Sequence, residues 1–162
     1  MTYYLYDPYS SVIWGRMFHD TDADNTEYDG AGGFEPGIAG QTVTLLDAHG
    51  SVKATTTTDA HGNYQFSGLP AGTYTIQFPT TVDGKTLVEK DVGDGTADSD
   101  GDQATGQTVQ IHLGEAQTLG EIDAGYRADQ NPDGIVSGDE TGNLIDAGYI
   151  GDPEGDMIDA GD

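Results

Sequence analysis

The sequence predicts an all-β protein, an antiparallel β-sandwich of about seven or eight short strands. Apolar and polar residues alternate with period two in several short runs, as they do in strands that are buried on one face. Glycine, aspartate and proline separate these runs at short intervals and are typical of turns. No segment of useful length shows the periodicity of an amphipathic helix.

The alternating runs define the expected strands along the chain. The first strand is expected from Val12 to Phe18, and Gln41–Leu46 follows with Val43 and Leu45 on one face. The same alternation predicts four further strand faces, formed by Val52, Ala54 and Thr56, by Tyr64 and Phe66, by Tyr74, Ile76 and Phe78, and by Val109, Ile111 and Leu113.

Short turns connect these strands. Asp47-Ala48-His49-Gly50 and Asp59-Ala60-His61-Gly62 are the same tetrapeptide, in which the aspartate can cap the turn and the glycine can adopt a positive φ. Leu69-Pro70-Ala71-Gly72 is a third turn. Short connections of this kind favour antiparallel neighbours.

The charge of the chain is strongly negative. Of its 162 residues, 29 are Asp or Glu and 5 are Lys or Arg, which gives a formal net charge of −24. Nucleic acid is therefore excluded as a partner, because phosphate binding needs a basic face. Divalent cations are the expected counter-ions. The absence of cysteine excludes disulfides and thiolate metal sites, and no apolar run is long enough to span a membrane.

Composition divides the chain into three zones. Residues 1–10 form a tyrosine-rich lead-in, residues 11–127 the sandwich, and residues 128–162 an acidic tail rich in Asp and Gly. The N-terminus lacks the charged start and apolar stretch of a signal peptide. We therefore expect either a signal that has been removed or export by another route.

A first group of carboxylates follows the first expected strand. Asp20, Asp22 and Asp24 occupy alternate positions of a loop, and Glu35 comes later. Carboxylates that converge in this way repel one another unless a cation lies between them, and hard oxygen ligands suit Ca²⁺. With Asp20 as position 1, Glu35 falls four residues beyond the position that a helix–loop–helix calcium loop uses, so Asn25–Asp29 are interpreted as an insertion. The alternative is a solvated acidic loop.

Two further groups of oxygen ligands are candidates for calcium. Asp98, Asp100 and Asp102 alternate between two expected strands, and Asp123 at the end of the last strand could join them. The tail offers Asp129, Asn131, Asp133 and Asp139. For the tail the alternative is a disordered acidic segment.

Several short sequence motifs occur in an order that is specific to one family. They are Gly15-Arg16-Met17-Phe18-His19-Asp20, Glu35-Pro36-Gly37-Ile38-Ala39-Gly40, Asp59-Ala60-His61-Gly62-Asn63-Tyr64, Leu69-Pro70-Ala71-Gly72-Thr73-Tyr74, Asp98-Ser99-Asp100 and Asp123-Ala124-Gly125-Tyr126. Residues 13–126 therefore resemble the calcium-binding B-type repeat domain of serine-aspartate-repeat (SdrD-like) bacterial adhesins. The resemblance implies an immunoglobulin-like sandwich of the Cna-B (prealbumin-like) kind. It also implies calcium at Asp20, Asp22, Asp24 and Glu35, and at Asp98, Asp100 and Asp123.

Two further expectations are drawn from the resemblance to known families. Some Cna-B domains carry a Lys–Asn isopeptide bond that needs a lysine on the first strand, where this chain has Arg16, so we predict no such bond. Residues 142–156 resemble segments that lie beside repeats-in-toxin (RTX) arrays, although the binding nonapeptide itself is absent. This second resemblance implies type I secretion.

The predicted function is structural. No nucleophile–base motif is visible, so the chain is not expected to be an enzyme. We predict a calcium-stabilised stalk, spacer or adhesive module of a secreted or cell-surface bacterial protein, with neighbouring repeat domains as partners. One alternative is the protomer of an extracellular filament or surface layer, joined through the exposed tyrosines of the lead-in. Another is a module that binds a glycan or a protein through its loops.

Overall fold

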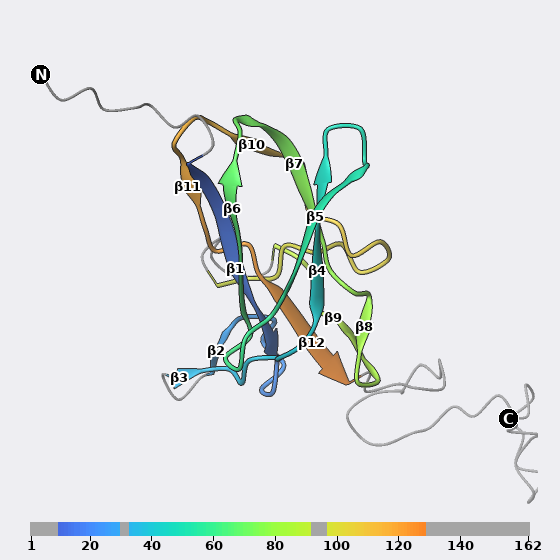
Figure 1. The fold of residues 1–162 in the computed structure, drawn as a ribbon. Helices are drawn as coiled ribbons and strands as arrows, with labels where there is room; N and C mark the ends of the chain where they lie inside the picture. The colour runs from blue at the N-terminus through green and yellow to red at the C-terminus, as the bar shows by residue number, and fades with distance from the viewer. Residues whose placement is uncertain (1–9, 30–32, 92–96, 129–162) are drawn as a thin grey trace, which may run out of the picture. The chain divides into compact units, whose positions relative to one another are not determined.

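Two β-sheets enclose one hydrophobic core in the computed structural model, which describes residues 10–29, 33–91 and 97–128 (Figure 1). The predicted all-β sandwich is therefore confirmed. Within these residues no segment forms a helix, and accordingly none could cross a membrane as a helix. The tyrosine-rich lead-in and the acidic tail lie outside the described residues.

The larger sheet is built around a long first strand. Its strands are β1 (Ser11–His19), β6 (Asn63–Leu69), β8 (Thr81–Val82), β9 (Lys85–Leu87), β11 (Thr118–Leu119) and β12 (Ala124–Ala128). β6 pairs with β1 in antiparallel orientation on one side. On the other side, β11 pairs with the first half of β1 and β12 with the second half, both in parallel orientation. β9 and β8 continue the sheet beyond β12.

The smaller sheet faces it across the core. Its strands are β4 (Thr42–Asp47), β5 (Val52–Thr57), β7 (Gly72–Gln77) and β10 (Ile111–Leu113), in the spatial order β10-β7-β4-β5. A separate small hairpin is formed by β2 (Tyr28–Asp29) and β3 (Gly33–Phe34). The two-residue and three-residue strands explain why the structure contains more strands than the seven or eight that the sequence predicts.

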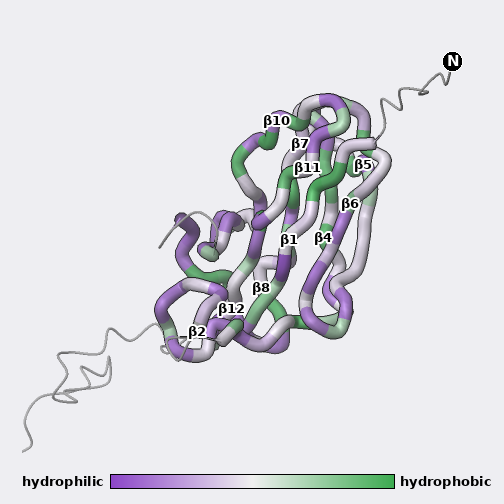
Figure 2. The backbone as a smooth tube through the Cα atoms, turned by 90° about the vertical axis from the view of Figure 1, so that its left-hand side faces the viewer, coloured by the Kyte–Doolittle hydropathy of each residue, from purple (hydrophilic) through white to green (hydrophobic). Residues whose placement is uncertain are grey.

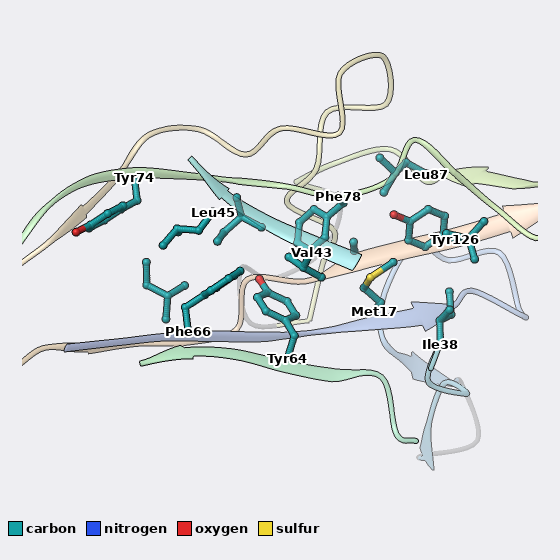
Figure 3. Packing of buried hydrophobic residues seen from close by; sticks show 14 of the residues in the cluster. Met17, Ile38, Val43, Leu45, Tyr64, Phe66, Tyr74, Phe78, Leu87 and Tyr126 are labelled. Carbon is teal, nitrogen blue, oxygen red and sulfur yellow. The ribbon is translucent and has the colours of Figure 1, made fainter. Parts of the chain in front are cut away.

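The core is formed by residues whose alternation the sequence shows. Val43 and Leu45 of β4 are fully buried, and the predicted faces of β6 and β7 also point inward (Figure 3). Figure 3 shows Met17, Tyr64 and Tyr126 from the larger sheet between the two layers. The hydroxyl of Tyr64 donates to the backbone oxygen of Ile122 at 2.7 Å, so this deeply buried polar group has a partner. Figure 2 shows hydrophobic stretches along the central strands and hydrophilic residues in the loop beside β2.

Two predicted inward positions are wrong. Val52 is 67% exposed, because β5 is the outermost strand of its sheet and Val52 lies at its start. Val109 is 69% exposed. Gln107 pairs with Gln77 and Ile111 pairs with Tyr74, so four steps along one strand oppose three along the other. This bulge turns Val109 outward, while Thr108 is buried in its place.

Candidate metal centre

Three carboxylates converge where β1 ends. Asp20, Asp22 and Glu35 each place a carboxylate oxygen within 4.8 Å of the others, and we call these residues the carboxylate cluster. Asp20 follows directly after β1, and its N–H donates to the backbone oxygen of Tyr126 in β12 at 3.0 Å. Asp20 and Glu35 are buried, whereas Asp22 is exposed. The cluster therefore has a buried base and an open side.

Hydrogen bonds from the loop hold these carboxylates in place. Glu35 Oε1 accepts from the backbone N–H of Thr21 at 2.8 Å and from that of Asp22 at 3.3 Å, and Glu35 Oε2 accepts from Thr21 Oγ1 at 2.6 Å. Asp20 Oδ1 accepts from the N–H of Ala23 at 2.8 Å. Ala23 and Asn25 have positive φ angles of 68° and 65°, so the loop curls tightly around Asp20.

Burial opposes the charge of Asp20. Its pKa is raised mainly by desolvation, which the hydrogen bond from Ala23 and the nearby Arg127 partly offset. Arg127 Nη1 lies 3.1 Å from Asp20 Oδ2. One guanidinium thus faces a cluster of three carboxylates, which leaves a local excess of negative charge that a cation would neutralise.

Asp24 and Asn25 have different positions from those the sequence predicts. Asp24 Oδ1 accepts from the N–H and the Oγ1 of Thr26, both at 2.8 Å, and Asp24 does not belong to the carboxylate cluster. Asn25 lies inside the expected insertion, yet its N–H donates to Asp20 Oδ2 at 3.3 Å. Its side-chain Oδ1 is buried and has no hydrogen-bond partner within the described part of the chain.

The donor set fits calcium better than a transition metal. Every ligand atom of the carboxylate cluster is a carboxylate oxygen, and Asn25 Oδ1 is a further hard oxygen without a partner among the described residues. Ca²⁺ accepts six to eight such oxygens in flexible geometry. Asp20, Asp22 and Glu35 would hold the ion, and its charge would offset their desolvation and mutual repulsion. Asn25 is absent from the predicted ligand set because it falls outside the alternate positions of Asp20, Asp22 and Asp24.

The second group of predicted ligands has another geometry. The N–H of Asp123 donates to Asp100 Oδ2 at 2.7 Å, and the N–H of Asp100 donates to the backbone oxygen of Asp123 at 2.9 Å. Asp123 Oδ1 accepts from the N–H of Arg16 on β1 at 2.7 Å. We call Asp100 and Asp123 the carboxylate bridge, because they connect three segments that are distant in sequence. Asp98 is buried beside them, and these three do not form a further convergent group among the described residues.

The carboxylate bridge is poorly solvated. Burial raises the pKa of Asp123 to about 8, with Glu27 and Asp100 adding repulsion, and the hydrogen bond from Arg16 opposes the shift. Burial also raises the pKa of Asp100 to about 6, and Asp98 adds to that effect. Near pH 7 the bridge therefore tends to keep a proton, which reduces its repulsion without a metal.

The remaining predicted ligands lie elsewhere. Asp102 Oδ1 accepts from the N–H groups of Ala104 and Thr105 at 3.1 Å and 2.9 Å, and bonds with Thr105 lower its pKa. Asp102 therefore caps its own turn. The tail ligands Asp129, Asn131, Asp133 and Asp139 lie outside the described residues.

Arg16 joins the two acidic regions. Besides its backbone bond to Asp123, its side chain donates to the backbone oxygen of Glu35 and to that of His61, and its Nη1 lies 3.5 Å from Glu27 Oε2. The sequence identified Arg16 only as the residue in place of a lysine. The sequence signal that could have indicated this role is a cationic residue, Arg16, on a strand that is followed by several acidic residues.

Comparison with known proteins identifies relatives for most of the chain. The family described as the SdrD B-like domain matches residues 12–126. Serine-aspartate repeat-containing protein F of Staphylococcus epidermidis (strain ATCC 12228 / FDA PCI 1200) is 38% identical over 133 residues, which cover 78% of this chain and 8% of that protein. Serine-aspartate repeat-containing protein D of Staphylococcus aureus (strain Newman) is 40% identical over 99 residues, which cover 59% of this chain and 7% of that protein. The chain thus spans less than a tenth of the length of these two relatives.

Solved structures with a similar arrangement include two proteins of Gram-positive bacteria. The Bacillus anthracis TIE protein has a TM-score of 0.48 and 12% identity, over 74% of this chain and 17% of that chain. GBS52, the minor pilin of Streptococcus agalactiae, has a TM-score of 0.44 and 14% identity, over 74% of this chain and 45% of that chain.

Proposed function

The chain belongs to the SdrD B-like domain family, and from this premise we propose that it is a calcium-stabilised structural module of an extracellular bacterial protein. The module acts as a stalk or spacer beside neighbouring domains. The much greater length of the matched relatives, two of which carry the word repeat in their names, supports this role. A sandwich filled by its own side chains also suits a spacer.

The convergence of Asp20, Asp22 and Glu35 carries the calcium proposal. These oxygens belong to two ends of one connection, since Asp20 follows β1 and Glu35 follows the β2–β3 hairpin. An ion between them would fasten this connection to the end of the sandwich. One site that binds only the folded form adds about 2.7 kcal/mol when free calcium is one hundredfold above Kd.

Thermal unfolding with calcium and with EDTA tests the proposal. We expect calcium to raise Tm by roughly 10 °C, given about 2.7 kcal/mol and a domain of this size. Glu35→Gln should remove most of that difference, because an amide supplies only one oxygen and carries no charge. Glu89→Gln changes an exposed carboxylate outside the cluster and should keep the difference. An equal Tm with calcium and with EDTA would refute the proposal.

A second candidate function is a self-assembling subunit. The observation that favours it is the open edge at β5, which pairs only with β4 among the described strands. An added strand can extend such an edge. We propose the tyrosine-rich lead-in as the added strand of a neighbouring copy. Deleting residues 2–9 should then convert an assembly into a monomer in light scattering, and an unchanged mass would contradict it.

We also propose that the acidic tail is a separate calcium-binding appendage with an RTX-like segment. In this proposal a type I system exports the protein. Its support is the sequence alone, through Asp129, Asn131, Asp133 and Asp139. Calcium titration of the whole chain and of a chain ending at residue 128 tests it. Equal numbers of bound ions would contradict a site in the tail.

A further inference from the structure

A pocket of about 240 Å³ lies on the outer face of the larger sheet, away from the core. Three aromatic rings line it, and all three are exposed: Trp14 at 39%, Tyr28 at 45% and Phe34 at 61%. Exposed aromatic rings gathered at one pocket are costly in water and indicate a binding surface.

The fold holds these rings in place from two sides. Trp14 is an outward-facing residue of β1, and its indole lies so close to Gly120 that a Cβ there would meet the ring at 2.1 Å. Tyr28 and Phe34 face each other across the β2–β3 hairpin, with ring centroids 4.9 Å apart. Figure 1 shows this hairpin beside the lower ends of β1 and β6. The pocket is therefore formed before any ligand arrives.

The charge of the pocket favours a cation. Glu27 and Glu121 line it together with a single cationic side chain, Arg16, which already pairs with Glu27. Asp123 also contributes to the lining. The pocket thus retains an excess of negative charge within a chain whose net charge is −24. A positively charged ligand would be attracted over a longer distance as well as bound locally.

The protein itself shows that one of these rings accepts a guanidinium. Arg16 Cζ lies 5.6 Å from the centroid of Phe34, within the range of a cation–π contact. Among the described residues, no cation lies over the ring of Trp14 or of Tyr28 in this way, so the faces of these two rings are not used. A second cation could use them with Glu121 as its counter-ion.

We propose that this pocket binds a lysine or arginine side chain presented by a partner protein. The ammonium or guanidinium group enters against the rings of Trp14 and Tyr28, and Glu121 pairs with its charge. A spacer needs no binding pocket, so this surface on β1 and the β2–β3 hairpin implies a role beyond that of a spacer. Specific contact with a basic partner adds to that role.

Binding can be followed at Trp14, because the chain contains one tryptophan. Its indole N–H resonance is recorded while the whole chain, in calcium buffer at constant ionic strength, is titrated with N-acetyl-lysine methylamide or N-acetyl-arginine methylamide. We expect saturable shifts with Kd on the order of 1–10 mM, as befits a single side-chain contact. The neutral isostere N-acetyl-norleucine methylamide should give no saturable shift.

Variants distinguish the pocket from the rest of the acidic surface. Tyr28→Ala and Glu121→Gln should each weaken binding about threefold to tenfold. Val52→Ala, at an exposed position on the other sheet, should bind as the parent does. Equal shifts with the norleucine compound, unchanged binding by Tyr28→Ala, or saturation by the neutral disaccharide maltose in place of the cations would overturn the proposal.

Discussion

The carboxylate cluster and the carboxylate bridge begin from the same sequence pattern and end in different structures. In the cluster, Asp20, Asp22 and Glu35 turn toward one point and are held by N–H groups of their own loop. In the bridge, Asp100 and Asp123 accept hydrogen bonds from segments far away in sequence. Alternate aspartates in a loop can thus either converge with another carboxylate or join hydrogen bonds between distant segments.

The largest expected effect is at the bridge. Asp123→Ala removes the acceptor for the N–H of Arg16 and leaves that partly buried group without a partner, so we expect a loss of about 3 kcal/mol in the free energy of unfolding. Urea unfolding in calcium and in EDTA measures it. A bridge that works through hydrogen bonds predicts the same loss in both buffers. A loss seen only with calcium would instead place an ion at Asp123.

The second prediction is a pH dependence of the free energy of unfolding, which we expect from the carboxylate bridge. The folded pKa values of Asp123 and Asp100, about 8 and about 6, lie above those of an unfolded aspartate. Between about pH 4, where an unfolded aspartate titrates, and about pH 8, the folded chain binds more protons than the unfolded chain. The contribution of these two groups to the free energy of unfolding is therefore most favourable below about pH 4 and falls as the pH rises to about 8. We expect the free energy of unfolding to decline over this range in EDTA, measured by unfolding at several pH values. Asp123→Asn should flatten this decline, and an unaltered slope would contradict its assignment to the bridge.

Much of the fold could be predicted because its signals are local. The strands that contribute Val43, Leu45, Tyr74 and Ile76 follow from alternation alone. The repeated turns are also confirmed, since Asp47 and Asp59 each accept from the backbone two and four residues later, and Gly50 and Gly62 have positive φ. A bulge is different, because it depends on pairing with a distant strand. Hence Val109 was predicted to point inward and does not.

The candidate site was predictable only in part for the same reason. The sequence names Asp20, Asp22 and Glu35 through their residue type and spacing, and the structure brings them together. It cannot distinguish Asp24, whose carboxylate turns to Thr26, from its neighbours. Nor does it indicate Asn25, because the positive φ angles that bring this residue back toward Asp20 arise from the whole loop. Hydrogen bonds within the folded loop decide which oxygens remain for an ion.

The smallest expected effect lies within the first loop and compares two neighbouring aspartates. Asp22→Asn removes a charge from the carboxylate cluster and should weaken calcium binding about tenfold, whereas Asp24→Asn should weaken it no more than about threefold. Isothermal titration with calcium measures both. Asp24 is bonded to Thr26 and acts on the ion only through its charge across the loop, so its effect should also diminish with added salt. Equal losses from the two substitutions would show that calcium draws Asp24 away from Thr26 and restores the ligand set that the spacing predicts.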